Sequence, residues 1–239
     1  MASGQVAPSM PHGSSRSADQ IATDLAAQIR VNMTEAGRVF LLSPARIGGP
    51  RSVMLLREQA EFDLAIRLRQ GAATIGEIYA FISGLYFRGK LAYTDVFSAA
   101  PRGIPPRLVI VPGMGLVPPE TILTYDQLQS IAKIPVDAGN TAYSGPFLRD
   151  AALLDQRAGS DCRHVLLGSI ATEKYTRPLL EVFGERLLVP AEFVGRGDMS
   201  RGGLMLRCAQ SPQELTYIAV QGAARHGSRP PKLKPLRTR

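Results

Sequence analysis

Short apolar runs alternate with amphipathic stretches along most of this chain. Runs of consecutive hydrophobic residues bounded by Gly or Pro are typical of strands that are buried on both faces. We expect three such strands, at residues 38–43, 107–112 and 163–168, and two shorter ones, at 187–189 and 204–208. Because the intervening stretches are long enough for helical crossovers, we expect the first three strands to be parallel.

The stretches between the strands carry helix-start signals and helical spacing. Four capping boxes, in which a hydroxyl and a carboxylate or amide satisfy free helix amides, occur at 17–20, 74–77, 124–127 and 211–214. The first predicts a helix with Ile21, Leu25, Ile29 and Met33 on one face. Other expected helices comprise a long one with Leu55, Phe62 and Ile66 on one face, ending at Gly71, one from 74 to Gly84, one at 86–97, one opened by Pro146, and one after Gly168 with Pro178 in its first turn.

This alternation predicts an α/β fold, a three-layer Rossmann-like domain with a mainly parallel sheet and an extra N-terminal helix. We expect one domain at 17–224, between disordered tails at 1–16 and 225–239. In open α/β sheets the ligand lies beyond the carboxyl ends of the strands. Segments rich in Gly, Ser, Thr or Arg follow those ends, at 43–46, 112–115, 168–172 and from Pro190. They predict a ligand crevice, although Gly and Pro also serve as simple turn residues.

The hydrophobic content of 45% is enough to build a core, which excludes disorder of the whole chain. The two cysteines exclude a disulfide framework, residues 1–15 contain no apolar stretch typical of a signal peptide, and no apolar run is long enough for a membrane span. We therefore expect a cytoplasmic protein without membrane contact. The three histidines have no metal-binding partner at ligand spacing, so we expect no metal site and no cofactor.

The net charge of +8 is concentrated in residues 225–239, which hold six of the 28 Lys and Arg residues and no acid. The remaining chain has 22 basic and 20 acidic groups and is nearly neutral. A flexible basic arm is typical of nucleic-acid binding through release of counterions from phosphates. A solvated tail that only aids solubility is equally consistent with this composition. The nucleic-acid hypothesis assigns the contacts to four basic residues: Arg225, Arg229, Lys232 and Lys234.

Two segments have part of a phosphate-binding motif, but each lacks a residue that the motif requires. Residues 84–91 have the glycine and lysine spacing of a P-loop, but Leu91 stands where a hydroxyl should reach magnesium, and the segment looks helical. Gly113 and Gly115 follow a strand, but Pro118 replaces the third glycine of a dinucleotide-binding motif. Neither motif supports nucleotide binding.

The segment 193–203 interleaves four glycines with two arginines, an acid and a hydroxyl. Glycine lets backbone amides approach an anion, and the guanidinium groups of Arg196 and Arg201 suit phosphate or carboxylate. We assign the candidate catalytic roles to Asp198, as a general base or an acceptor from a sugar hydroxyl, and to Ser200. A flexible hairpin in which Asp198 pairs with its neighbouring arginines is the structural alternative.

A second cluster follows the strand at 163–168. Ser169 and Thr172 lie where free helix amides are expected, and Lys174 adds a positive charge. A phosphate would be well placed there, and an ordinary N-cap is the alternative. Arg46, which follows the first strand, completes the anion-binding set.

Several short motifs follow one another in the first half of the chain: Leu42–Ala45, Ser83–Arg88 with Leu91–Tyr93, Val109–Pro112 with Gly115–Pro118, and Tyr125–Asp126. In this order they resemble YaaA-like proteins and related Rossmann-like families linked to nucleic-acid stress and modification. The resemblance spans residues 38–126, and the arginine–glycine segment at 196–203 has no counterpart in it. It implies DNA-associated work without naming a reaction.

Two hypotheses remain open. The first is an enzyme that acts on a nucleotide, nucleoside or nucleic-acid base, with an anionic small molecule bound in the crevice. The second is a non-catalytic nucleic-acid-binding protein whose basic tail supplies most of the affinity. The sequence leaves the substrate, the reaction and the oligomeric state open.

Overall fold

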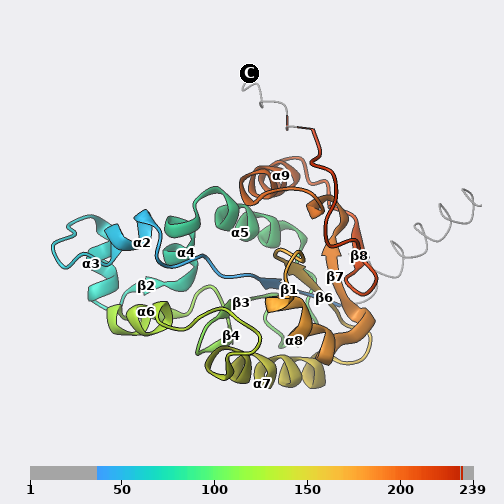
Figure 1. Ribbon diagram of the computed structural model, residues 1–239, viewed down its shortest axis with the longest axis horizontal. Helices are drawn as coiled ribbons and strands as arrows, with labels where there is room; N and C mark the ends of the chain where they lie inside the picture. Colours follow the sequence, from blue (N-terminus) through green and yellow to red (C-terminus); the bar gives the residue numbers. More distant parts are fainter. Residues whose placement is uncertain (1–36, 232, 234–239) are drawn as a thin grey trace, which may run out of the picture. The chain divides into compact units, whose positions relative to one another are not determined.

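The structure, a computed structural model, describes residues 37–231 and 233. A six-stranded sheet in the order β4-β3-β1-β6-β7-β8 lies at the centre of this part of the chain (Figure 1). The strands are β1 (Arg38–Leu42), β3 (Arg107–Val111), β4 (Gly115–Val117), β6 (Arg163–Leu167), β7 (Leu187–Pro190) and β8 (Tyr217–Ala219). The neighbours β3, β1, β6 and β7 are parallel, whereas β4 and β8 pair antiparallel at the two edges. The predicted parallel sheet is confirmed.

Helices cover both faces of this sheet. The helices of the described residues are α2 (Pro50–Leu55), α3 (Asp63–Arg69), α4 (Ile75–Ser83), α5 (Leu85–Phe97), α6 (Tyr125–Ala132), α7 (Thr141–Ala158), α8 (Glu173–Phe183) and α9 (Asp198–Gln210). Figure 1 shows α5 and α9 on one side of the sheet and α7 and α8 on the other. Short strands β2 (Ala73–Thr74) and β5 (Ile122–Leu123) form a separate antiparallel pair. None of the helices in the described range is long and apolar enough to cross a membrane.

The central strands are apolar because both of their faces are covered. Phe40 of β1 meets the ring of Tyr93 from α5 at 5.8 Å between centroids. Val165 of β6 pairs with Phe40, and the residue before it, His164, stacks on Phe183 of α8 with 3.8 Å between the ring centroids. Burial lowers the pKa of His164 to about 3, with a smaller contribution from Arg186, so this histidine is a neutral core residue.

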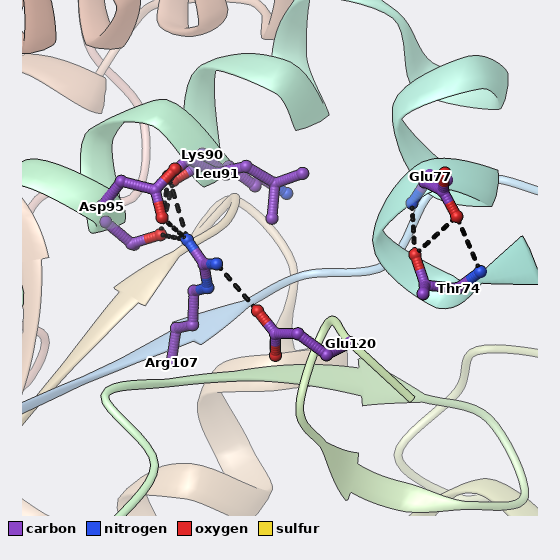
Figure 2. A network of polar contacts seen from close by, with 8 residues as sticks. Thr74, Glu77, Lys90, Leu91, Asp95, Arg107 and Glu120 are labelled. Carbon is purple, nitrogen blue, oxygen red and sulfur yellow. Dashed lines mark hydrogen bonds and ion pairs between the residues drawn. The ribbon is translucent and has the colours of Figure 1, made fainter. Parts of the chain in front are cut away.

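Local signals place several helices where the sequence predicts them. Thr74 and Thr124 each complete a capping box, at the starts of α4 and α6. The Thr74–Glu77 box is visible in Figure 2. Gly84 ends α4 with a φ of +59°, a conformation that favours glycine, and α5 begins at the next residue. The segment with P-loop spacing is therefore helical.

The expected strand at 204–208 is wrong, because these residues belong to α9. Its glycines serve a close helix crossing rather than a loop. A Cβ on Gly202 would lie 2.6 Å from the carbonyl oxygen of Leu85, and one on Gly89 would lie 2.6 Å from that of Gly202. The two helices approach so closely only because neither position has a side chain. This crossing brings the start of α9 against α5.

Four further helix predictions differ from the structure. The capping-box sequence at 211–214 begins no helix, because the chain turns there and enters β8. The long helix expected to end at Gly71 is two short ones, α2 and α3. Pro146 and Pro178 lie in the second turns of α7 and α8, where each removes one helical hydrogen bond. Asn140 starts α7 instead, and its side chain accepts from the amide of Ala142. The predicted helix with Ile21 to Met33 lies outside the described residues.

Arg107 ties α5 to the start of β3, at the opposite end of the strand from the candidate site. From the start of β3 it donates to Asp95 of α5, and it lies 2.8 Å from the carboxylate of Glu120 (Figure 2). Paired carboxylates on both sides satisfy the guanidinium. We therefore assign this network a structural role.

Candidate functional site

A cavity of about 630 Å³ opens at the carboxyl ends of the parallel strands. Ser43 follows β1, Pro112 follows β3 and Ser169 follows β6, and all three line it. Helices α4, α5 and α8 contribute Tyr79, Tyr86 and Tyr175 to its wall. We call this space the inner cavity. It lies where an open α/β sheet commonly binds its ligand.

A second cavity of about 620 Å³, the outer cavity, shares Ser169 and Asp198 with the inner one. Its wall contains residues 195–201, together with Ala171 and the basic residues that follow 224. The structure thus brings the arginine–glycine segment beside the turn after β6, as expected for a shared site. Asp198, at the first position of α9, lies at the boundary of the two spaces.

Positive charge dominates both walls. The cationic side chains are Arg46, Lys133 and Lys174 at the inner cavity, and Arg196, Arg201, Arg225 and Arg229 at the outer one. Asp198 is the one acidic residue among the described residues of the two linings. A concave surface of one charge sign raises the local concentration of ligands of the opposite sign.

The two arginines of the α9 segment have different surroundings. Arg201 is buried, and its Nε and Nη2 donate to the carbonyl oxygen of Phe193 at 3.2 and 3.0 Å. Its Nη1 lies 3.4 Å from a carboxylate oxygen of Asp198. Arg196 donates from Nη1 to Ser200 at 3.2 Å, and its buried Nε has no partner among the described residues. Arg196 is therefore less buried than Arg201 and has more of its five N–H donors unpaired among the described residues.

The other predicted anion-binding residues are divided between cavities. Arg46 is exposed at the inner cavity, and Lys174 lies there with its Nζ 4.9 Å from the ring centroid of Tyr175. Ser169 accepts from the amide of Ala171 at 3.3 Å, which makes an ordinary turn contact. Thr172 lines neither cavity but a third, smaller one that also contains Lys174. Its side chain makes no capping hydrogen bond to α8.

The first residues of the basic tail contact the body of the protein. Arg225 pairs with Glu173 at 2.7 Å. A Cβ on Gly195, which has a φ of +73°, would lie 2.3 Å from the carbonyl oxygen of Ser228, so the tail passes directly over this glycine. Arg229 lines the outer cavity, whereas Lys232 and Lys234 lie outside the described residues. The described start of the tail is therefore part of the candidate site.

Lys90 is the functional candidate that sequence reasoning missed. It is 1% exposed, and its Nζ donates to the Oγ of Ser43 at 2.7 Å and to the carbonyl oxygen of the same residue at 2.8 Å. Among the described residues no carboxylate lies within 4.0 Å of this nitrogen, which sits 4.1 Å from the ring centroid of Tyr86. The pKa of Lys90 is lowered to about 7, mainly by burial; Asp198 partly opposes this shift, and Arg201 adds to it.

Two tyrosines place buried hydroxyls at the inner cavity. Tyr79 and Tyr86 are almost fully buried, and neither hydroxyl makes a hydrogen bond to another described residue. Burial raises the pKa of both, which keeps them neutral. Neutral phenols donate as well as accept, and buried hydroxyls in folded proteins nearly always have a partner. The two hydroxyls are therefore buried groups without a partner among the described residues, carried by side chains that line the inner cavity.

A signal for Lys90 was present in the sequence. Positions 86, 87, 93 and 94 lie three or four residues away and are buried on the same face of α5. A lysine on an apolar helix face needs an internal partner or a lowered pKa. Its partner, Ser43, lies 47 residues earlier, so the pairing itself was not readable.

Comparisons with protein-family models, curated proteins and solved structures find no match to this chain. The resemblance to YaaA-like families stays a prediction, and the function of the site has to be inferred from its own geometry and charge.

Proposed function

We propose that the two cavities bind a phosphate-bearing ligand of the nucleotide class, and that the protein is an enzyme that acts on a nucleotide, nucleoside or nucleic-acid base. The observation that carries this proposal is the charge of the walls, whose described residues include seven basic side chains and the single carboxylate of Asp198. Arg225 and Arg201 have carboxylate neighbours, and the remaining five basic residues keep the site cationic.

The walls suit the two halves of such a ligand. Tyr79, Tyr86 and Tyr175 give the inner cavity aromatic surface and neutral hydroxyls, which favour a flat heterocyclic base. Arg196 and Arg229 give the outer cavity guanidinium groups, which favour phosphate oxygens. Each volume falls in the range of about 300–1,000 Å³ that small-molecule sites occupy. A nucleotide would span both.

Asp198 and Ser200 are the catalytic candidates of this hypothesis. Asp198 lies where the cavities meet, so its carboxylate would face the sugar of a ligand that spans them. It would accept a hydrogen bond from a sugar hydroxyl or act as a general base. Ser200 lines the outer cavity beside Arg196, where its hydroxyl would contact phosphate.

The test is a binding series with a matched control. Calorimetric titration with a nucleoside, its mono- and diphosphate, and inorganic phosphate should give tightest binding for the phosphorylated nucleosides. Arg196→Ala should weaken diphosphate binding about 10- to 100-fold, the effect of losing one charge-assisted hydrogen bond. Arg102→Ala removes an exposed arginine that lines neither cavity and should leave binding unchanged. Equal binding of nucleoside and nucleotide, or none of either, would contradict the proposal.

Nucleic-acid binding without catalysis is the second candidate, and the position of the tail favours it. Arg225 and Arg229 line the outer cavity beside Arg196, which makes one cationic surface of tail and body. A phosphodiester backbone would follow such a surface. A protein of this class would bind oligonucleotides far more tightly than mononucleotides, which separates it from the enzyme in the same titration.

A further inference from the structure

The hydroxyl of Ser43 and the amine of Lys90 form a buried pair beside the inner cavity. Ser43 lines the cavity directly after β1, whereas Lys90 lies behind it on α5. Their side-chain atoms are 2.7 Å apart, within the reach that proton transfer needs. The serine hydroxyl also lies 3.3 Å from the carbonyl oxygen of Leu167, a longer and weaker contact.

We propose that Ser43 is a nucleophile and Lys90 its general base, and that together they transfer the acyl group of an ester that carries a negative charge. The requirement for negative charge rests on the proposed function of the cavities, whereas the Ser–Lys chemistry rests on the pair alone. A serine hydroxyl is a weak nucleophile until an adjacent base removes its proton. Lys90 is the basic group in contact with it.

Lys90 has the surroundings that a lysine base requires. Its ordinary pKa of 10.5 would keep it protonated, but burial lowers that pKa to about 7 and so leaves much of the amine neutral at physiological pH. The charged groups that face it are Asp198 and Arg201 of α9, with opposite effects. On its own helix the neutral Tyr86 lies against it. Among the described residues, no carboxylate pairs with Lys90 and holds it charged.

The reaction balances without an outside oxidant or metal. Ser43 Oγ bonds to the carbonyl carbon of the ester while its proton passes to the neutral Nζ of Lys90. The tetrahedral adduct then collapses, the bond to the alcohol oxygen breaks, and Lys90 returns the proton to the departing alcohol. Lys90 then takes a proton from water, whose oxygen bonds to the acyl carbon. The bond from that carbon to Ser43 Oγ breaks, Lys90 returns the proton to Oγ, and the acid leaves with both residues restored.

Tyr86 is placed to assist at the carbonyl oxygen. It lines the same cavity, lies against Lys90, and carries a buried hydroxyl without a hydrogen-bonding partner among the described residues. A neutral phenol donates to a developing negative charge, which is the role of an oxyanion-hole donor. The basic residues Arg46 and Lys174 at the same cavity would hold the charged part of the ester.

Labelling with an alkyl fluorophosphonate tests the pair directly. Ser43 Oγ would bond to phosphorus, fluoride would leave, and Lys90 would take the proton. Peptide mapping by mass spectrometry should find the adduct on Ser43 and not on Ser83, which lines the same cavity but makes no hydrogen bond to a lysine among the described residues. The labelling rate should rise with pH, with a midpoint near pH 7, and then reach a plateau where Lys90 is neutral. Absence of a Ser43 adduct, or an adduct spread over other serines, would overturn the proposal.

Variants assign the roles. Ser43→Ala should abolish the adduct. Lys90→Met still contains the Ser43 hydroxyl, but its labelling should be at least about 100-fold slower because the general base has been removed. Circular dichroism confirms folding of each variant, and the mapping of the unaltered chain remains decisive if one fails to fold. An undiminished rate in Lys90→Met would refute the role of the lysine.

A protection experiment distinguishes the proposal for Ser43 and Lys90 from the proposal that the cavities bind a nucleotide. A nucleoside diphosphate added before the probe should slow labelling, because it would occupy the same space. Labelling of Ser43 without such protection would support the pair and contradict nucleotide binding in the inner cavity. Diphosphate binding without any labelling would support the cavities and overturn the pair.

Discussion

The burial of Lys90 should make the stability of the protein depend on pH in an unusual direction. In the unfolded chain this lysine has its ordinary pKa of 10.5, and in the folded protein a pKa of about 7, mainly because of burial. The difference corresponds to about 5 kcal/mol of free energy that opposes folding while the lysine is charged. This cost is present in full below the folded pKa. It disappears as the pH rises toward the unfolded pKa, since the unfolded chain then binds more protons than the folded one.

From about pH 7 to pH 9 the free energy of unfolding should rise by about 2 kcal/mol relative to a variant without the lysine. Lys90→Met keeps the length of the side chain and removes its titration. Urea unfolding of both proteins across this range gives the difference, in which the contributions of all other titrating groups cancel. Lys133→Met is the matched control, because Lys133 lines the same cavity and is exposed.

The stability of Lys90→Met should therefore exceed that of the unaltered protein most at low pH, with the gap narrowing as the pH rises. For Lys133→Met the gap should stay constant. A constant gap for Lys90→Met, or one that widens with pH, would show that the lysine is charged and satisfied in the folded protein. A lysine that stays charged cannot accept the proton of Ser43, so Lys90 could not act as the general base.

Three further predictions concern particular contacts. Gly202→Ala should destabilise the protein by about 1–3 kcal/mol, because the new Cβ would collide with the backbone of α5. Gly203→Ala should be neutral or stabilising by up to about 1 kcal/mol, because the nearest atom to its new Cβ is 3.6 Å away. Thermal unfolding of both variants measures the difference. Arg201→Met should lower the free energy of unfolding by about 2–4 kcal/mol because it removes two hydrogen bonds to Phe193, whereas Arg196→Ala should change chemical unfolding by less than about 1 kcal/mol. If the tail contacts nucleic acid, deletion of 225–239 should reduce the slope of log affinity against log salt by about 3–5, as measured by fluorescence anisotropy on duplex DNA, and an unchanged slope would refute that contact.

The sequence by itself determined the parallel sheet and the place of the crevice. After the arginine with which each begins, the runs at β1 and β3 are apolar, and β6 is apolar apart from His164, because helices cover both of their faces. That composition is visible without a structure. The threonine capping boxes at 74 and 124 are equally local, since hydroxyl and partner lie three residues apart. Parallel strands in turn require their carboxyl ends to meet at one edge, so the residues after β1, β3 and β6 had to converge.

Tertiary structure alone decided the chemistry of the site. The glycines of α9 have poor helix propensity, and residues 198–208 were predicted as a glycine-rich segment followed by a strand. Contact with α5 nevertheless requires glycine at 202. The guanidinium of Arg201 is committed to the carbonyl of Phe193, a choice that spacing does not reveal. Ser43 and Lys90 come together across 47 residues, and the lysine's lowered pKa arises from burial. Burial is a property of the surroundings, which many distant segments supply at once, and no local pattern in the chain encodes it.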